Sequence, residues 1–438
     1  MAAFSVFANA NRPLTRGEVE GLTNVWRARG LIPVLVAVAS AFAAWALLLP
    51  VVPTNVIDDG QPTSLAGLST GVFMLATVIT QVFTPRALRT LGYRRVIAVS
   101  SLLLGVPALG YMLGMDPAPL LTVSAIRGVG FGALSVAEAA IVAELVPLRL
   151  LGSATGIFGL VVGLAQMLAL PAGLALVDVV GYRPVYAIAG AIGLVSLVAS
   201  FAVPVIPQPA PESETAQGVH VPMWHLVLVP ALALMFITTA YGAITNFLPV
   251  SMRELDPARG AALGGVMLSV LNFAAMLSRY AAGKIMDRRG YPGSVLIPFQ
   301  IVAALGVLLM AAILALKLPV WVMFIAALLY GAGFGAAQNE ALTMMFYRLP
   351  RHKTSEASAV WNIAFDGGTG LGSTFYGMLI TTMAFAPMFG IAGGVIAIGL
   401  VVTLLDRRLG KHRVVEVNNL SARLKSVQAP RRYPRDEQ

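Results

Sequence analysis

Long runs of apolar residues, separated by short polar stretches, dominate the pattern along this chain. The first run extends from Leu31 to Val52, after a polar segment that carries four arginines. About 20 consecutive apolar residues are enough for an α-helix to cross the hydrocarbon core of a bilayer. The pattern predicts twelve transmembrane helices, at residues 31–52, 65–84, 94–114, 119–146, 152–177, 184–204, 224–249, 260–282, 293–316, 319–347, 355–383 and 385–405.

A cleaved signal peptide is the alternative interpretation of the first run, since the small residues Ala37–Ala44 could resemble a cleavage site. The polar leader is long, however, and the apolar run continues well past these small residues. The first run is therefore predicted to be a transmembrane helix with the N-terminus inside the cell.

A repeat in the sequence indicates that the chain consists of two related halves. Arg127-Gly-Val-Gly-Phe-Gly-Ala recurs 203 positions later as Tyr330-Gly-Ala-Gly-Phe-Gly-Ala, and the same offset relates residues 153–158 to residues 356–361. Internal repeats of this kind are typical of transporter folds. We therefore expect an all-α polytopic membrane protein whose twelve helices form two pseudo-symmetric six-helix halves. The copies keep their small residues, as close helix packing in lipid requires, but differ in their ionisable residues.

The two halves and their connections predict five segments. A cytoplasmic N-terminal segment (1–30) precedes the first six-helix bundle (31–204), and a Pro-rich cytoplasmic linker (205–222) leads to the second bundle (223–406). A basic cytoplasmic tail (407–438) follows. The linker contains neither Lys nor Arg, so its cytoplasmic placement depends only on the number of preceding spans.

Composition and charge agree with a membrane protein. The chain is 58% hydrophobic and 11% charged, with a mean hydropathy of +0.81, whereas about a quarter of the residues are charged in soluble domains. A net charge of +10 could suggest a nucleic-acid partner, but 24 of the 30 Lys and Arg residues fall in segments predicted to be cytoplasmic. The positive-inside rule explains this distribution. We expect a monomer in the cell membrane, with both termini cytoplasmic and no nucleic-acid partner.

Charged side chains inside the predicted helices indicate a functional or structural role, because a charge at the bilayer centre costs about 3 kcal/mol on insertion scales. The candidates for proton coupling are Asp366, Glu138, Arg127 and Glu340. Arg127 and Glu138 are three helical turns apart on one face, roughly 16 Å along the axis, so they could line one hydrated pathway but cannot pair. Structural roles are the alternative: a clamp to a neighbouring helix for Arg127, and a silent pair or a helix cap for the acids.

Asp366 is the strongest of these candidates. At this position the repeat replaces Gly163 with an acid, and Asn362 lies on the same helix face four residues earlier. Three glycines among the next four residues weaken the helix and allow another helix or a substrate to approach closely. The candidates for lining a substrate cavity are Asn362, Gln338, Asn339, Trp361, Asn246 and Gln166. Packing in the core or against lipid is the alternative for the aromatic ones.

Residues 279–290 contain a recognisable loop motif, Arg279-Tyr-Ala-Ala-Gly283-Lys-Ile-Met-Asp287-Arg288-Arg289-Gly290. This stretch resembles the signature loop G-x-x-x-D-R-x-G of the major facilitator superfamily, which in that family ties neighbouring helices together on the cytoplasmic side. The resemblance implies a gating and structural role for Arg279, Gly283, Asp287, Arg288 and Gly290.

The N-terminal counterpart of this loop departs from the family pattern. It keeps Gly92, Arg94 and Arg95, for which the resemblance implies the same gating role, but it has Pro85 and Arg89 in place of the first glycine and the aspartate. This departure leaves the fold unaffected and removes the acid that a charge relay at this loop would use.

Two further motifs indicate the branch of the superfamily. Arg127-x-x-Gly130-x-Gly132 is similar to a superfamily motif whose arginine is associated with proton coupling. Residues 159–173 contain spaced glycines followed by Pro171-Ala-Gly173, and they resemble the glycine-proline motif of drug/proton antiporters. The pattern therefore resembles the bacterial export branch.

The expected function is that of a secondary transporter that works by alternating access. Proton-coupled export of a small amphipathic or hydrophobic compound is favoured, and an importer or facilitator of a sugar, an organic anion or another metabolite is the alternative. An anionic substrate would need bases in the cavity, and only Arg127 is clearly available from the sequence. An enzyme is disfavoured, because all four histidines lie in loops or at helix ends. No G-x-x-x-x-G-K-[ST] motif indicates ATP binding, and no cofactor or metal is expected.

Overall fold

The computed structural model describes residues 12–206, 223–290, 292–349, 353–380 and 382–409, and within these ranges it contains helices and no strand. Most of the predicted linker and nearly all of the predicted basic tail lie outside the described residues. The long helices are α3 (Leu31–Asp58), α4 (Thr63–Leu91), α5 (Tyr93–Gly105), α6 (Pro117–Glu144), α7 (Leu151–Val180), α8 (Tyr182–Ser200), α9 (Met223–Ser251), α10 (Gly260–Arg289), α11 (Leu296–Leu316), α12 (Trp321–Arg348), α13 (Thr354–Ile380) and α14 (Phe385–Leu409).

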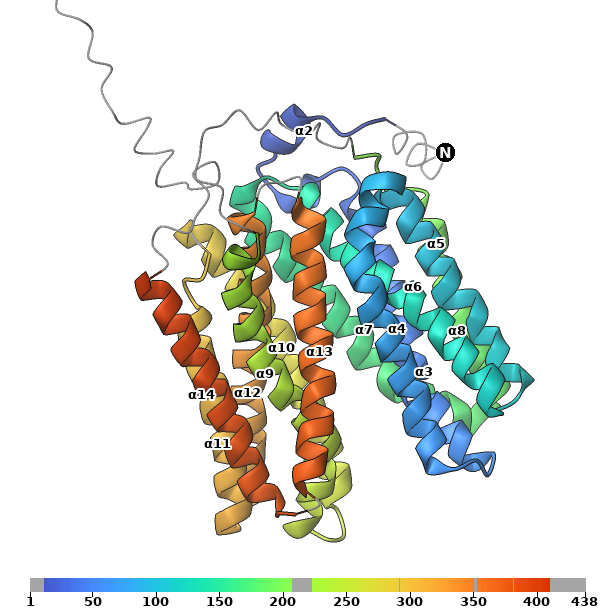
Figure 1. Cartoon of the computed structure of the whole chain (residues 1–438), viewed down its shortest axis with the longest axis vertical. Coiled ribbons are helices and arrows are strands. Elements are labelled where there is room, and N and C mark those ends of the chain that lie inside the picture. The colour runs from blue at the N-terminus through green and yellow to red at the C-terminus, as the bar shows by residue number, and fades with distance from the viewer. Residues whose placement is uncertain (1–11, 207–222, 291, 350–352, 381, 410–438) are drawn as a thin grey trace, which may run out of the picture.

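Within the described ranges, eleven membrane spans are long and apolar enough to cross a bilayer. Helix α13 is of similar length (27 residues) and runs alongside the others (Figure 1), but it carries Asn362, Asp366 and several glycines and threonines. The all-α fold predicted from the sequence is confirmed, and the long helix that is not among these eleven spans is the one that carries the strongest candidate for proton coupling.

The helices form two groups, α3–α8 and α9–α14 (Figure 1). We call the end at which α4, α6, α10 and α12 finish the basic end. The short helix α2 (Arg16–Glu20) lies there, since Arg149 donates a hydrogen bond to the carbonyl oxygen of Glu20 at 2.7 Å. The bases that follow or close the helices at this end are Arg86, Arg89, Arg94, Arg95, Arg149, Lys284, Arg288, Arg289 and Arg348.

The repeated glycines perform equivalent packing roles in the two halves. A Cβ atom at Gly132 of α6 would lie 2.4 Å from the carbonyl oxygen of Thr77 in α4, and one at Gly335 of α12 would lie 2.0 Å from that of Ala275 in α10. Gly130 and its repeat mate, 203 positions later, contact the backbones of α5 and α11 in the same way. The shared glycines therefore let the fourth helix of each half approach its neighbours at backbone distance.

We expect Gly335→Ala to lower the free energy of unfolding by about 1–3 kcal/mol, because an added methyl group at backbone contact forces helices apart. Gly265→Ala is the matched control, since a Cβ atom there meets nothing within 4 Å. Thermal unfolding of the purified protein in detergent, followed by tryptophan fluorescence, measures the difference. Equal unfolding temperatures for the two variants would show that the contact is not tight.

Several predicted helices differ in extent from the observed ones. Helices α4 and α10 each continue seven residues past their predicted ends, to Leu91 and Arg289. Helix α3 continues past residue 52 to Asp58, through Pro50 and Pro53, because neighbouring helices can compensate for the lost backbone hydrogen bonds of prolines inside a membrane bundle. The third predicted span is α-helical only as far as Gly105 and continues as a 3₁₀ helix over Val106–Leu113. Pro107 lies in its first turn and lacks the N–H that an α-helix would use.

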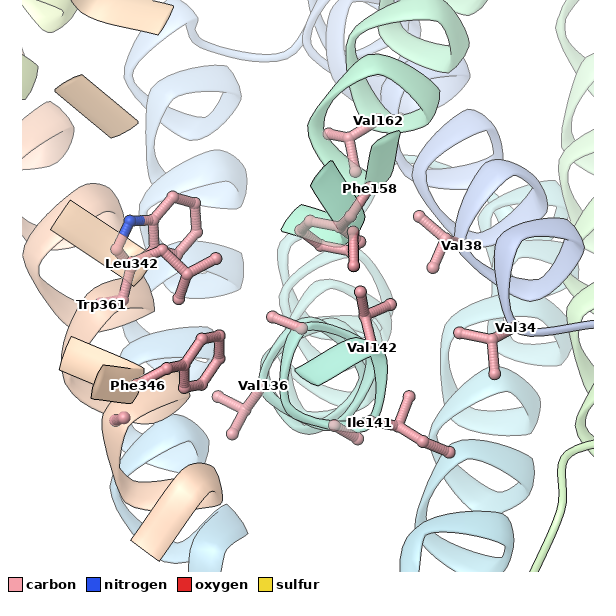
Figure 2. Packing of buried hydrophobic residues seen from close by; sticks show 14 of the residues in the cluster. Val34, Val38, Val136, Ile141, Val142, Phe158, Val162, Leu342, Phe346 and Trp361 are labelled. Atoms are coloured by element: carbon pink, nitrogen blue, oxygen red, sulfur yellow. The ribbon is translucent and has the colours of Figure 1, made fainter. Parts of the chain in front are cut away.

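Apolar packing joins the two halves towards the basic end. One cluster of buried side chains contains residues of α3, α6 and α7 together with residues of α12 and α13. Figure 2 shows part of it, with Val136 and Phe158 of the first half facing Phe346, Leu342 and Trp361 of the second. Three further clusters are confined to single halves, one within residues 46–189, one within residues 233–396 and a small one within residues 282–336.

Candidate functional site

Two contacts that involve charged side chains join the halves at the basic end. The Asp287 carboxylate accepts hydrogen bonds from the backbone N–H groups of Gly152, at 2.9 Å, and Ser153, at 2.8 Å, in the first turn of α7. Arg89 of α4 forms an ion pair with Glu356 in the first turn of α13. Ser153 and Glu356 occupy equivalent positions of the sequence repeat, so the two contacts are equivalent in position. In one, an acid of the loop motif binds backbone N–H groups; in the other, a base at the loop position binds an acid.

The two contacts are not of equal strength. An anion at a helix N-terminus interacts favourably with the helix dipole and with free N–H groups, and Asp287 is partly buried. The Arg89 side chain is half exposed, and exposed ion pairs contribute roughly 0–1 kcal/mol. The loop motif of the second half therefore bridges the halves, whereas the sequence led us to expect that it would brace neighbouring helices of its own half.

Helix α7 touches α10 along a row of glycines, which we call the glycine stripe: Gly152, Gly156, Gly159 and Gly163. Gly152 lies against Gly283, where a Cβ atom on Gly283 would come 2.0 Å from the Gly152 carbonyl oxygen. Gly159 lies against the Arg279 side chain and Gly163 against Met276. The stripe brings the backbones of the two halves together and positions Arg279 between them.

A cavity lies at the interface between the halves, beside the glycine stripe. Its volume is about 80 Å³, which is room for about five water molecules. Trp45 stacks on Phe131 in the first half with ring centroids 4.8 Å apart, and Tyr241 stacks on Phe334 in the second half at 4.4 Å. Eight aromatic residues contribute to the lining: Phe42, Trp45, Phe131, Phe158, Tyr241, Phe334, Trp361 and Phe365.

One base and one acid are found among the residues that line the cavity, Arg279 and Asp366. The Arg279 guanidinium carbon lies 5.4 Å from the centre of the Trp361 ring and 5.7 Å from that of Phe158. Its Nη1 donates to Gln338 Oε1 at 2.9 Å. A buried cation between two aromatic faces is held by cation–π attraction as well as by this hydrogen bond.

Asp366 connects the cavity to the other half of the protein. Its Oδ2 accepts a hydrogen bond of 2.6 Å from Gln81 Nε2 of α4. Gln81 Nε2 also lies 3.4 Å from Ser135 Oγ, while Gln81 Oε1 is buried without a partner among the described residues. The Asp366 carboxyl group therefore lines the cavity and also forms a hydrogen bond between the two halves.

All these inter-half contacts lie between the middle of the helices and the basic end. Among the hydrogen bonds and ion pairs that join the two halves within the described ranges, the Gln81–Asp366 bond lies farthest from the basic end. The two helix groups diverge towards the opposite end in Figure 1. The structure thus shows the halves closed at the basic end.

The comparison with known families identifies the fold. The sequence profile described as Major Facilitator Superfamily matches residues 34–373. The chain belongs to this superfamily. Its fold is similar to a solved structure of the proton:xylose symporter XylE bound to 6-bromo-6-deoxy-D-glucose, with a TM-score of 0.68 and 15% sequence identity, over 88% of this chain and 95% of that chain. Superfamily members are transporters and not enzymes, in agreement with the sequence prediction.

Arg127 and Glu138 both lie outside the cavity of this superfamily member, in contrast to the predicted shared pathway along α6. Arg127 donates from Nε to the carbonyl oxygen of Leu104 at 3.1 Å and from Nη2 to that of Ala44 at 3.3 Å. These bonds clamp α6 to α5 and α3, which is the structural alternative given for Arg127. Glu138 is fully buried in the first half, and its two carboxyl oxygens have no hydrogen-bond partner among the described residues.

The remaining predicted residues separate into cavity and non-cavity positions. Asn362, Gln338, Trp361 and Gln166 line the cavity. Three do not. Asn339 and Glu340 follow Gln338 directly and lie on other sides of α12: Asn339 is buried near Gly283, and Glu340 accepts from the backbone N–H of Gly293 in the α10–α11 connection. Asn246 of α9 donates to Ser373 Oγ at 3.0 Å.

The other residues of the two loop motifs lie at the basic end. Gly290 ends α10 in a left-handed conformation, with φ of 73°, and Gly92 connects α4 to α5 with φ of 80°. Both are positions that favour glycine. Arg288 and Arg95 are exposed, and the Arg94 guanidinium lies 5.9 Å from the centre of the Phe201 ring.

The sequence reasoning missed two amides at the site. Gln81 interacts with Asp366, and Asn272 lines the cavity and accepts from the Tyr241 hydroxyl at 3.2 Å. Each is an isolated amide within a predicted apolar span. That signal could have identified them, since polar groups inside a membrane bundle face the interior or a hydrated cavity.

Proposed function

We propose that the protein is a proton-coupled secondary transporter of a small amphipathic compound, with the central cavity as its substrate site and export as its direction. The observation that carries the proposal is a cavity between two pseudo-symmetric halves in which an acid and a base lie among aromatic walls. Alternating access at a site between two repeats is the general mechanism of such folds. The positive-inside rule places the basic end on the cytoplasmic side of the cell membrane. The protein is proposed to act as a monomer.

Asp366 is the proposed proton carrier. A carboxylate inside the bilayer must be neutralised or hydrogen-bonded, because an unpaired charge there is costly. When the halves are closed at the basic end, the Gln81 side-chain N–H donates a hydrogen bond to the Asp366 carboxylate. When the halves part at that end, this bond breaks and the carboxyl group favours the protonated form. Protonation is thereby coupled to the conformational change.

Uptake of a polar metabolite such as a sugar is the second candidate. Four amide side chains, those of Gln166, Asn272, Gln338 and Asn362, line the cavity, and the similar fold of XylE belongs to a proton:xylose symporter. The aromatic lining and the resemblance to the antiporter motif favour an amphipathic compound and export.

Proteoliposomes that contain a pH-sensitive dye test the proposal. With an acidic interior and the basic end exposed outside, addition of an amphipathic aromatic compound should cause its accumulation together with alkalinisation of the interior, whereas D-xylose should cause neither. Co-transport of protons with D-xylose would favour the second candidate. Movement of the aromatic compound without any proton flux would contradict proton coupling.

A further inference from the structure

The guanidinium group of Arg279 has donors that nothing in the described part of the protein accepts. The residue is only 6% exposed, and Gln338 accepts from Nη1. Nε and Nη2 are buried and have no hydrogen-bond partner there. Among the ion pairs of the described residues, none includes Arg279. Buried charged donors without acceptors are costly, so a ligand that accepts from them would gain free energy on binding.

The protein holds this group in a fixed position at the cavity wall. Trp361 and Phe158 face it from the two halves. Gly159 provides the space, since a Cβ atom there would lie 2.0 Å from Arg279 Nε. A guanidinium that is already oriented loses little side-chain freedom when it binds a partner.

The two free donors suit one class of acceptor. Nε and Nη2 form the side edge of the planar guanidinium, whose two N–H groups are parallel, and a carboxylate accepts such a pair with two hydrogen bonds. The other charged lining residue, Asp366, already accepts from Gln81. Among the described residues, no carboxylate accepts from this edge.

We propose that Arg279 binds the carboxylate of a small aromatic acid in the central cavity. The inference rests on the proposed function, in that it takes this cavity as the substrate site. The stacked rings of Trp45 and Phe131 on one side and of Tyr241 and Phe334 on the other provide aromatic surfaces for the ring of such a substrate. The substrate anion and the proton then use different groups, Arg279 and Asp366.

A binding experiment on the purified full-length protein in detergent tests this proposal without any transport measurement. The probes are benzoate, 4-hydroxybenzoate and indole-3-acetate, each compared with its neutral amide. We expect each carboxylate that binds to bind at least about tenfold more tightly than its amide, because only the carboxylate can accept two charge-assisted hydrogen bonds. Intrinsic tryptophan fluorescence and the shift in unfolding temperature report binding.

Three variants assign the effect to Arg279. Arg279→Gln should remove the preference for carboxylates. Arg279→Lys should weaken it, because an ammonium group cannot form the paired contact. Gly159→Ala keeps the charge but displaces the guanidinium, so it should also weaken carboxylate binding. Gly265→Ala, on the same helix as Arg279 and in open space, should bind as the wild type does.

Three outcomes would overturn the proposal: amides that bind as tightly as the acids, carboxylates that bind equally well to Arg279→Gln or Gly159→Ala, or no binding of any of the three carboxylates to the wild type. If Arg279→Gln does not fold, the Lys and Gly159 variants decide. A protein that couples protons to a neutral or cationic compound in liposomes but fails this test retains the proposed function and loses the aromatic-acid assignment. The converse result would retain the binding site and reject proton-coupled transport.

Discussion

Replacing Asp366 with asparagine is expected to abolish accumulation of substrate against a gradient while the variant still folds and binds substrate. Asparagine can accept the Gln81 N–H through its side-chain oxygen but cannot take up or release a proton. One coupled proton and a gradient of one pH unit support about tenfold accumulation, since one pH unit corresponds to about 1.4 kcal/mol. In proteoliposomes this ratio should fall to about one, whereas exchange of internal for external substrate should continue.

The controls for this prediction are the two other buried acids of the helices. Glu138→Gln and Glu340→Gln should retain accumulation, because Glu138 is buried within the first half and Glu340 accepts from the backbone of the α10–α11 connection. Wild-type accumulation by Asp366→Asn, together with its loss in either control, would transfer the coupling role to α6 or α12.

Asp287→Asn is expected to shift the population towards the state that is open at the basic end. The contact of the Asp287 carboxylate with the first turn of α7 is the stronger of the two charged contacts between the halves at that end. Interactions of an anion with a helix N-terminus are worth up to about 2 kcal/mol, so the equilibrium should shift by about 5- to 30-fold. Substrate binding should remain, since Asp287 does not line the cavity.

Pairs of spin labels measure this shift, and the absence of native cysteine simplifies their placement. Labels on cysteines at the exposed positions Arg95 and Lys284 report the separation of the halves at the basic end. The long-distance population should increase in Asp287→Asn and stay unchanged in Arg289→Gln, a neutralised base at an exposed position of the same helix turn. Equal distance distributions for Asp287→Asn and the wild type would show that the loop motif contributes to folding and not to the equilibrium between the two states.

The helix pattern and the two halves could be predicted from the sequence, because both depend on local periodicity and on a repeat. The identity of the cavity base could not. Arg127 and Arg279 are both single bases in apolar spans, and they differ in what surrounds them. Arg127 meets the carbonyl oxygens of Leu104 and Ala44 within its own half, whereas Arg279 reaches the interface between the halves.

The same limit applies to contacts that join distant parts of the chain. Asp366 was identified because the repeat replaces a glycine with an acid there, but its partner Gln81 lies 285 positions earlier in α4. The replacement of the loop aspartate by Arg89 looked like the loss of a contact. In the structure the contact is kept with reversed charge, because Glu356 stands opposite Arg89.

The glycine stripe has a consequence for how the protein can change over generations. At its four positions in α7 the stripe offers only backbone and hydrogen atoms to α10, so these positions add no side chain that would have to move when the halves part and rejoin. A Cβ atom at any of the four stripe positions would lie 2.0–3.2 Å from an atom of α10. A larger residue there would therefore obstruct every transport cycle, whatever the substrate. The cavity side chains carry no such constraint. New substrates can therefore be acquired by exchanging aromatic and amide residues around the cavity, while α7 keeps its glycines.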